Sequence, residues 1–150
     1  MEMSPDLKEL LALFRSHGVE CVVVGAHALA LHGLPRFTAD LDLLLNRSEE
    51  NVDRVLAALG DFGFDGLGLS REDFLTPDQV IQLGNAPNRV DLLTSISGVE
   101  WDDAESGAVT GKLGEVPVRF LGRDELIRNK RASGRLKDRA DLEALLSGEE

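Results

Sequence analysis

One stretch of this chain, residues 22–45, constrains its fold more than any other. It begins with apolar residues typical of a buried strand, passes through Gly25-Ala26 into a short helix, and returns as a strand that carries Asp40 and Asp42. Because side chains alternate across a strand, the two aspartates share one face and the neighbouring leucines point toward a core. The pattern predicts a strand, a helix and a second strand in direct succession.

The pair Asp40 and Asp42 has two interpretations. Without a basic neighbour, two carboxylates on one face repel, and each makes the other harder to ionise. Oxygen ligands favour a hard cation, and Mg²⁺ in proteins typically takes one or two carboxylates together with substrate phosphates. The alternative is a strand edge that carries Asp-x-Asp toward solvent without a function.

Gly25 favours the metal-binding interpretation, because it stands where the strand turns sharply into the helix. Glycine lets the backbone approach a ligand closely, and a helix N-terminus offers free N–H groups to a phosphate. A phosphate-binding turn beside a metal-binding pair predicts a site for a nucleoside triphosphate with Mg²⁺.

At these residues the sequence resembles the nucleotidyltransferases of the DNA polymerase beta superfamily. Their signature is a hydrophobic residue, a glycine and a small residue, followed after a gap by Asp-hydrophobic-Asp. Here the two parts are Val24-Gly25-Ala26 and Asp40-Leu41-Asp42-Leu43. The small residue is usually Ser or Gly, so Ala26 removes any hydroxyl contact to a phosphate.

Two further segments are similar to the abortive-infection (AbiEii-type) toxin branch of that superfamily. The first is residues 28–32 with Arg36 and Thr38, and the resemblance implies that Arg36 and Thr38 join Gly25 and Ala26 in binding the nucleotide. The second is the basic segment near the C-terminus. The matching residues there are Lys130, Arg135, Asp138 and Asp141.

For the basic segment, the resemblance implies that Lys130 contacts the triphosphate and that Asp138 orients a reacting or phosphate-binding group, with Arg135 beside them. The alternative is a solvated helix face with local ion pairs such as Lys137–Asp141, because oppositely charged residues four apart on a helix attract each other.

A third catalytic carboxylate comes, in the same superfamily, from a neighbouring strand. Asp91 is the candidate here, because it is embedded in an apolar strand between Val90 and Leu92. On that strand it shares a face with Arg89 and Leu93. The alternative is an exposed strand-edge residue that pairs with Arg89 across a turn.

The whole chain has 150 residues and is 43% hydrophobic, which predicts a single domain over residues 1–150 with a real core. We expect an α/β (α+β) fold, with a mixed, partly antiparallel sheet and helices packed on it. The lone Cys21 predicts a buried thiol in a reducing cytoplasm. No apolar run reaches the ~18 residues of a membrane span. The net charge of −11 disfavours broad nucleic-acid binding, although residues 128–139 are strongly basic.

Caps, glycines and hydrophobic spacing predict the remaining elements. A helix begins after Ser4-Pro5, and another begins with a capping box at residues 46–49 and ends at Gly60. Residues 60–68 are irregular, and Gly111-Lys112 is a turn rather than a phosphate loop. The other expected segments are a strand at 19–24, a helix at 26–32, a helical turn after Ser70, strands at 80–83 and 89–95, a hairpin at 109–121, and helices at 124–130 and 136–146.

These inferences lead to a metal-dependent nucleotidyltransferase that moves a nucleoside monophosphate from a nucleoside triphosphate to an acceptor hydroxyl. Asp40, Asp42 and Asp91 would hold two Mg²⁺ ions, for which Mn²⁺ could substitute. The sequence leaves the acceptor open between tRNA, a protein and a small molecule. The expected protein partner is either a second copy of this chain, in a homodimer, or the other component of a toxin–antitoxin pair. The alternative function is a nucleotidyltransferase-like module that binds without turnover.

Overall fold

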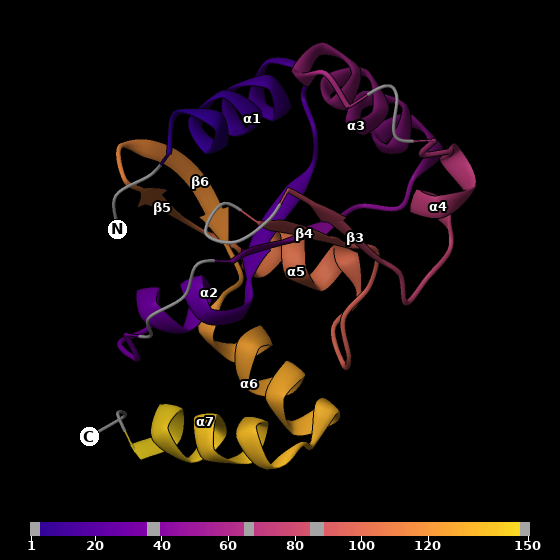
Figure 1. Cartoon of the computed structure of the whole chain (residues 1–150). Coiled ribbons are helices and arrows are strands. Elements are labelled where there is room, and N and C mark those ends of the chain that lie inside the picture. The colour runs from indigo at the N-terminus through magenta and orange to yellow at the C-terminus, as the bar shows by residue number, and fades with distance from the viewer. Residues whose placement is uncertain (1–3, 36–39, 65–67, 85–88, 148–150) are drawn as a thin grey trace.

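A computed structural model describes residues 4–35, 40–64, 68–84 and 89–147. Helices and strands alternate along most of the chain, as expected (Figure 1). The helices are α1 (Pro5–Ser16), α2 (Gly25–Leu31), α3 (Glu49–Phe62), α4 (Arg71–Leu75), α5 (Trp101–Gly107), α6 (Arg123–Ser133) and α7 (Leu136–Ser147). The strands are β1 (Cys21–Val24), β2 (Leu41–Leu45), β3 (Val80–Leu83), β4 (Val90–Leu93), β5 (Val109–Leu113) and β6 (Val116–Phe120).

The strands form one mixed sheet in the order β3-β4-β2-β1-β6-β5. Strand β1 runs antiparallel to β2 and parallel to β6, whereas β2 runs parallel to β4. The two outer pairs, β3 with β4 and β5 with β6, are antiparallel hairpins. The expected fold class, α/β with a mixed, partly antiparallel sheet, is confirmed.

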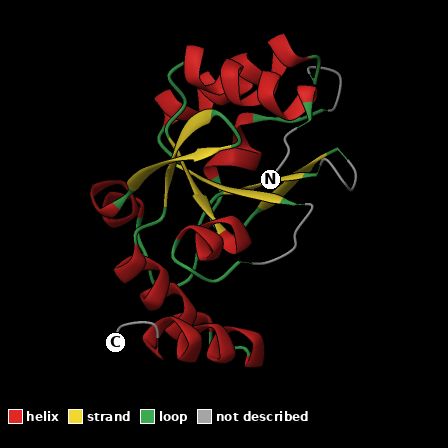
Figure 2. Ribbon diagram, turned by 90° about the vertical axis from the view of Figure 1, so that its left-hand side faces the viewer, coloured by secondary structure: helices red, strands yellow, loops and turns green. Residues whose placement is uncertain are grey.

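Helices cover both faces of the sheet (Figures 1 and 2). On one face α1, α3 and α4 cover a core that includes Phe14, Val55 and Phe74, together with Leu41 and Leu43 of β2. On the other face a second core includes Val24 and Leu44 of the sheet with Leu29, Leu126 and Leu145. Alternation along β2 thus sends its odd-numbered leucines into one core and leaves Asp42 on the face of the other.

Helix α1 begins as its sequence predicts. The Ser4 hydroxyl accepts a hydrogen bond from the Leu7 N–H at 3.2 Å, and Pro5 occupies the first turn. The side chains at helical spacing, Leu7, Leu10, Leu11 and Phe14, are all buried. A cap of this kind is worth about 1 kcal/mol, so local sequence and core packing agree at this end of the chain.

Several boundaries differ from the sequence expectation. Ser48, not Asn46, caps α3, and the helix continues through Gly60 to Phe62 because the left-handed Gly63 (φ 104°) is the residue that ends it. Gly111 and Lys112 lie inside β5 rather than in a turn, since the hairpin turns at Gly114. Helix α5 was not predicted from sequence, because its acidic stretch buries only Ala104.

In α7, Leu145 is buried and Leu146 is 37% exposed. One expectation about a single residue also changes. Cys21 is half-buried, and burial raises the pKa of its thiol to about 12, so the thiol stays protonated at neutral pH. None of the helices within the described ranges is long and apolar enough to cross a membrane.

Candidate active site

Three carboxylates gather where β2 and β4 begin. Asp42 of β2 lies directly opposite Asp91 of β4 in the register of these parallel strands. Asp40 stands two residues before Asp42 and lines the same cavity of about 360 Å³ as the other two carboxylates. The structure therefore brings Asp91 to the pair that the sequence singled out.

The electrostatics of Asp42 reflect this crowding. Burial, the charges of Asp91 and Asp40, and a hydrogen bond to the Asp91 carboxyl group raise the pKa of Asp42 to about 6. Arg89 opposes the shift and does not cancel it. Close to neutral pH, Asp42 is therefore a carboxylate that would gain from an added positive charge.

Gly25 makes room for Asp42. Its backbone has a φ of 70°, a conformation that side chains other than glycine rarely adopt. A Cβ atom at this position would lie 2.2 Å from Asp42 Oδ2, so any larger residue would displace the carboxylate. The close approach seen at Gly25 is thus to Asp42, and the expected approach to a phosphate stays a prediction. Gly25 and Ala26 both line the cavity.

Arg89 is a basic neighbour that the sequence around Asp40 and Asp42 did not indicate. Its guanidinium donates to both carboxylate oxygens of Asp91, at 3.0 and 2.9 Å, and its Nη2 lies 3.2 Å from Asp40 Oδ2. The interpretation of Asp91 as an exposed edge residue is wrong, because Asp91 is 7% exposed on an inner strand. The same interpretation named Arg89 as the partner correctly, but the two residues lie two positions apart at the start of β4 rather than across a turn.

The carboxylates fit a hard divalent cation by their chemistry, because an all-oxygen ligand set suits Mg²⁺. The space left for the Asp42 carboxylate by the missing side chain of Gly25, and the raised pKa of Asp42, also agree with a site that a bound cation would stabilise. As they stand, however, no three Asp, Glu, His or Cys side chains in the described ranges enclose a metal position. Arg89 would have to release Asp40 and Asp91 before a cation could join them.

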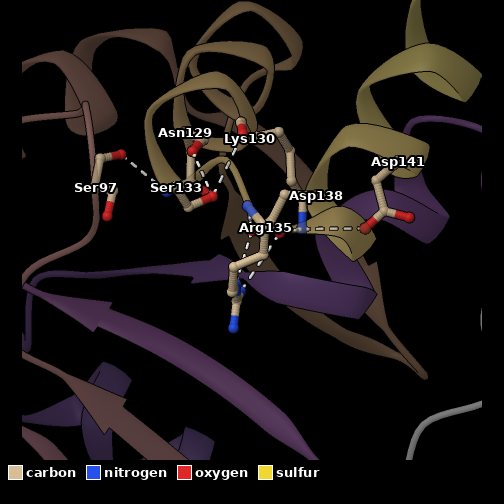
Figure 3. A network of polar contacts seen from close by, with 7 residues as sticks. All are labelled: Ser97, Asn129, Lys130, Ser133, Arg135, Asp138 and Asp141. Atoms are coloured by element: carbon tan, nitrogen blue, oxygen red, sulfur yellow. Dashed lines mark hydrogen bonds and ion pairs between the residues drawn. The ribbon is translucent and has the colours of Figure 1, made fainter.

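The basic segment faces the carboxylates across the cavity. Lys130 of α6 is 7% exposed, and its Nζ lies 3.2 Å from Asp138 and 3.2 Å from Asp141, both on α7 and both 1% exposed (Figure 3). The interpretation of this segment as a solvated face is therefore wrong for Lys130, Asp138 and Asp141. Lys130, Arg135 and Lys137 all line the cavity that holds Asp42.

Asp138 organises this group of charges. It accepts from Arg135 Nε at 2.7 Å and from Lys130 Nζ at 3.2 Å. The Arg135 guanidinium first, and then Ser133 and Lys130, hold the pKa of Asp138 well below its usual range. Asp138 thus stays ionised and fixes Lys130 and Arg135 beside the cavity. That it orients a reacting or phosphate-binding group stays a prediction.

Two of the predicted site residues, Arg36 and Thr38, fall outside the described residues, so the structure does not place them. The sequence did not indicate Arg89 or Lys137 as site residues, nor Ser97 of the loop after β4, nor Asn129 and Ser133 of α6. Arg89 could have been found from its place two residues before Asp91 on one strand face. The other residues carry no local signal, because tertiary packing, including that of α6 and α7, brings them to the cavities beside Asp42.

Comparison with known proteins supports the fold. The structure superposes on the crystal structure of a "putative nucleotidyltransferase" from Thermotoga maritima with a TM-score of 0.61, covering 95% of this chain and 91% of the other. The two sequences are 16% identical, so the similarity establishes a shared nucleotidyltransferase-like fold. No protein-family model and no curated protein matches the sequence.

Proposed function

We propose that this protein is a metal-dependent nucleotidyltransferase that transfers a nucleoside monophosphate from a nucleoside triphosphate to an acceptor hydroxyl. The observation that carries the proposal is the pairing of Asp42 with Asp91 across β2 and β4, with Asp40 beside them and Lys130 across the same cavity. Carboxylates and fixed cations around one cavity suit a triphosphate that arrives with a divalent ion. The fold of the Thermotoga maritima protein supports the same class.

Asp40, Asp42 and Asp91 would hold Mg²⁺, as two ions of which one is shared with the triphosphate. When bound, the ions supply charge neutralisation at the attacking and leaving oxygens and lower the pKa of the acceptor hydroxyl. Asp91, released by Arg89, would help to accept the hydroxyl proton. The hydroxyl oxygen forms the new bond to the α-phosphorus, the α–β phosphoanhydride bond breaks, and pyrophosphate leaves.

The cations of the site would bind the triphosphate. Lys130 forms ion pairs with Asp138 and Asp141, and Arg135 forms one with Asp138. Both side chains are therefore ordered before a ligand binds, so binding loses less side-chain conformational entropy. The Gly25-Ala26 turn would seat the β- and γ-phosphates, without a hydroxyl contact from Ala26. Arg36 and Thr38 complete the proposed set on the evidence of sequence resemblance.

A second candidate function follows from Arg89. Since its guanidinium neutralises Asp40 and Asp91, the domain could bind a nucleotide or a partner without turnover. Ala26 fits the same alternative. Membership of the abortive-infection branch, with a toxin–antitoxin partner or a tRNA acceptor, is supported by sequence resemblance alone.

The decisive experiment compares nucleotide binding with and without a divalent ion. The melting temperature should rise when ATP or GTP is added in Mg²⁺, and it should not rise in EDTA. The reason is that the carboxylates repel a triphosphate that carries no cation. A ligand at 100 times its dissociation constant adds about 2.7 kcal/mol to the unfolding free energy. Equal stabilisation in EDTA would contradict metal-bridged binding. Transfer of label from [α-³²P]ATP then separates an enzyme from a binding module.

A further inference from the structure

The cavity that holds the carboxylates continues into a second one. A space of about 450 Å³ adjoins the first, and the two share four lining residues: Gly25, Asp42, Lys130 and Arg135. We call the first the ionic lobe, because its other lining residues include Asp40, Arg89, Asp91 and Lys137. We call the second the amide lobe, and its other lining residues include Leu93, Ile96, Ser97, Asn129, Ala132 and Ser133.

The two lobes differ in chemistry. Beyond the shared residues, no charged side chain of the described chain lines the amide lobe. Leu93 and Ile96 offer half-buried apolar surface, whereas Asn129 and two serines offer an amide and hydroxyls. Apolar walls with a few convergent polar groups are typical of sites for small organic molecules, and about 450 Å³ lies within the about 300–1,000 Å³ usual for such sites.

The polar wall of the amide lobe is held in place by its own hydrogen bonds (Figure 3). Asn129 Nδ2 donates to the Ser97 carbonyl oxygen at 2.9 Å, and Ser133 Oγ donates to the Asn129 carbonyl oxygen at 3.0 Å. The turn after Ser97 packs closely against α6, because a Cβ atom added to Gly98 would lie only 2.5 Å from the Cβ of Ala132. The wall therefore joins the loop after β4 to α6 before any ligand binds.

We infer that the amide lobe binds the nucleoside part of the nucleoside triphosphate, while the ionic lobe binds its phosphates and the divalent ion. This inference rests on the proposed function. A nucleoside triphosphate is itself divided in this way, with an uncharged base and sugar that form hydrogen bonds at one end and a highly charged chain at the other. The lobes meet at Asp42 and Lys130, so the α-phosphorus, where the two parts of the ligand join, falls beside the proposed metal ligands.

The test measures binding of ATP, GTP, CTP and UTP, and of inorganic tripolyphosphate, in Mg²⁺ by calorimetry. Ser97→Phe and Asn129→Phe each fill the amide lobe from a side chain outside the buried core. Ser16→Phe is the matched control, because Ser16 is exposed on α1, on the opposite face of the sheet. Melting curves identify any variant that has lost its fold.

In the wild type, the best nucleotide should bind at least about tenfold more tightly than tripolyphosphate, a difference of about 1.4 kcal/mol. Both filled variants should lose that difference and keep the tripolyphosphate affinity, and Ser16→Phe should keep both. Unchanged nucleotide binding in both filled variants would overturn the inference and leave the proposed function standing, with the amide lobe free for an acceptor. Parallel loss of both ligands in folded filled variants would overturn it too. Failure of every ligand to bind the wild type would overturn the proposed function as well.

Discussion

The backbone of Gly25 lies against the carboxylate of Asp42, so closely that a Cβ on Gly25 would be 2.2 Å from Asp42 Oδ2. Val24, the residue before Gly25, is the strand partner of Asp42 across β1 and β2. The end of one strand thus fixes where the carboxylate of the next can lie. Glycine is required at this point for two reasons, its positive φ and its missing side chain.

Gly25→Ala should therefore destabilise the protein by more than backbone strain alone. Gly18→Ala is the matched control, because Gly18 has nearly the same φ, 69°, and its nearest neighbour atoms lie 4.0 Å from a Cβ. Left-handed strain should cost each variant about 1–2 kcal/mol, and Gly25→Ala should lose more through the clash. Urea unfolding measures both. Adding Asp42→Ala should remove the excess at Gly25, and an excess that persists would contradict the clash.

Asp42→Asn should stabilise the metal-free protein or leave its stability unchanged, because the substitution removes a carboxylate crowded by Asp40 and Asp91. Allowing for solvent screening, the gain is on the order of 1 kcal/mol, or a rise of about 2–4 °C in melting temperature. The same substitution should abolish Mg²⁺-dependent nucleotide binding. Melting curves in EDTA, and in Mg²⁺ with ATP, test both statements. A clear loss of stability in EDTA with retained binding would remove Asp42 from the site.

The pH dependence of stability should carry the same signature. Asp42 has a folded-state pKa of about 6, above the 3.8 of an unperturbed aspartate, so between these pH values the folded state binds more protons than the unfolded state. Its contribution to stability is therefore present at low pH and is lost as the pH rises toward 6. The wild type should lose stability relative to Asp42→Asn over this window. A difference between their melting temperatures that stays constant from pH 4 to pH 7 would contradict the raised pKa.

Arg89→Gln should bind Mn²⁺ or Mg²⁺ more tightly than the wild type, because the guanidinium competes with the ion for Asp40 and Asp91. Relieving one such contact should raise the affinity about tenfold, or about 1.4 kcal/mol. Titration of Mn²⁺ without nucleotide, followed by electron paramagnetic resonance, measures the ion alone. Arg71→Gln is the control, since Arg71 pairs with Asp53 at 2.8 Å on the surface. Weaker Mn²⁺ binding in Arg89→Gln would show instead that Arg89 supports the ion site.

Lys130→Ala should destabilise the protein strongly, because it leaves Asp138 and Asp141 buried without their shared cation. Removal of one member of a buried ion pair typically costs about 3–5 kcal/mol. Lys137→Ala, an exposed residue of the same cavity, should change stability by no more than about 0.5 kcal/mol. Denaturant unfolding measures the free energy of unfolding of both variants. Similar decreases in the two would mean that the buried charge of Lys130 does not stabilise the fold more than the exposed charge of Lys137 does.

Nucleotide affinity in the same two variants separates the structural role of Lys130 from its ligand role. Lys130→Arg keeps the charge, so it should recover part of the stability. If Lys130 also contacts the triphosphate, Lys130→Ala should weaken ATP binding more than Lys137→Ala does, at a temperature where both variants are folded. Equal ATP affinities would limit Lys130 to holding α7 against α6.

The local sequence was sufficient to predict one half of the site. Asp40 and Asp42 share a face because a strand alternates with a period of two, and Gly25 marks the turn because few other residues tolerate its φ. The start of α1 was predictable for the same reason, since a cap and its first turn are neighbours in sequence. Such features depend on backbone geometry over a few residues.

The tertiary structure decided the other half. Asp91 reaches Asp42 only because β4 pairs with β2, and that pairing depends on how two cores pack on a shared sheet. The burial of Lys130 between Asp138 and Asp141 follows from the docking of α7 on α6, although the sequence alone allowed a solvated helix face. Residue types and local periodicity determined which side chains could form a site. Long-range packing determined which of them meet, because contact between distant segments is set by the free energy of the whole fold.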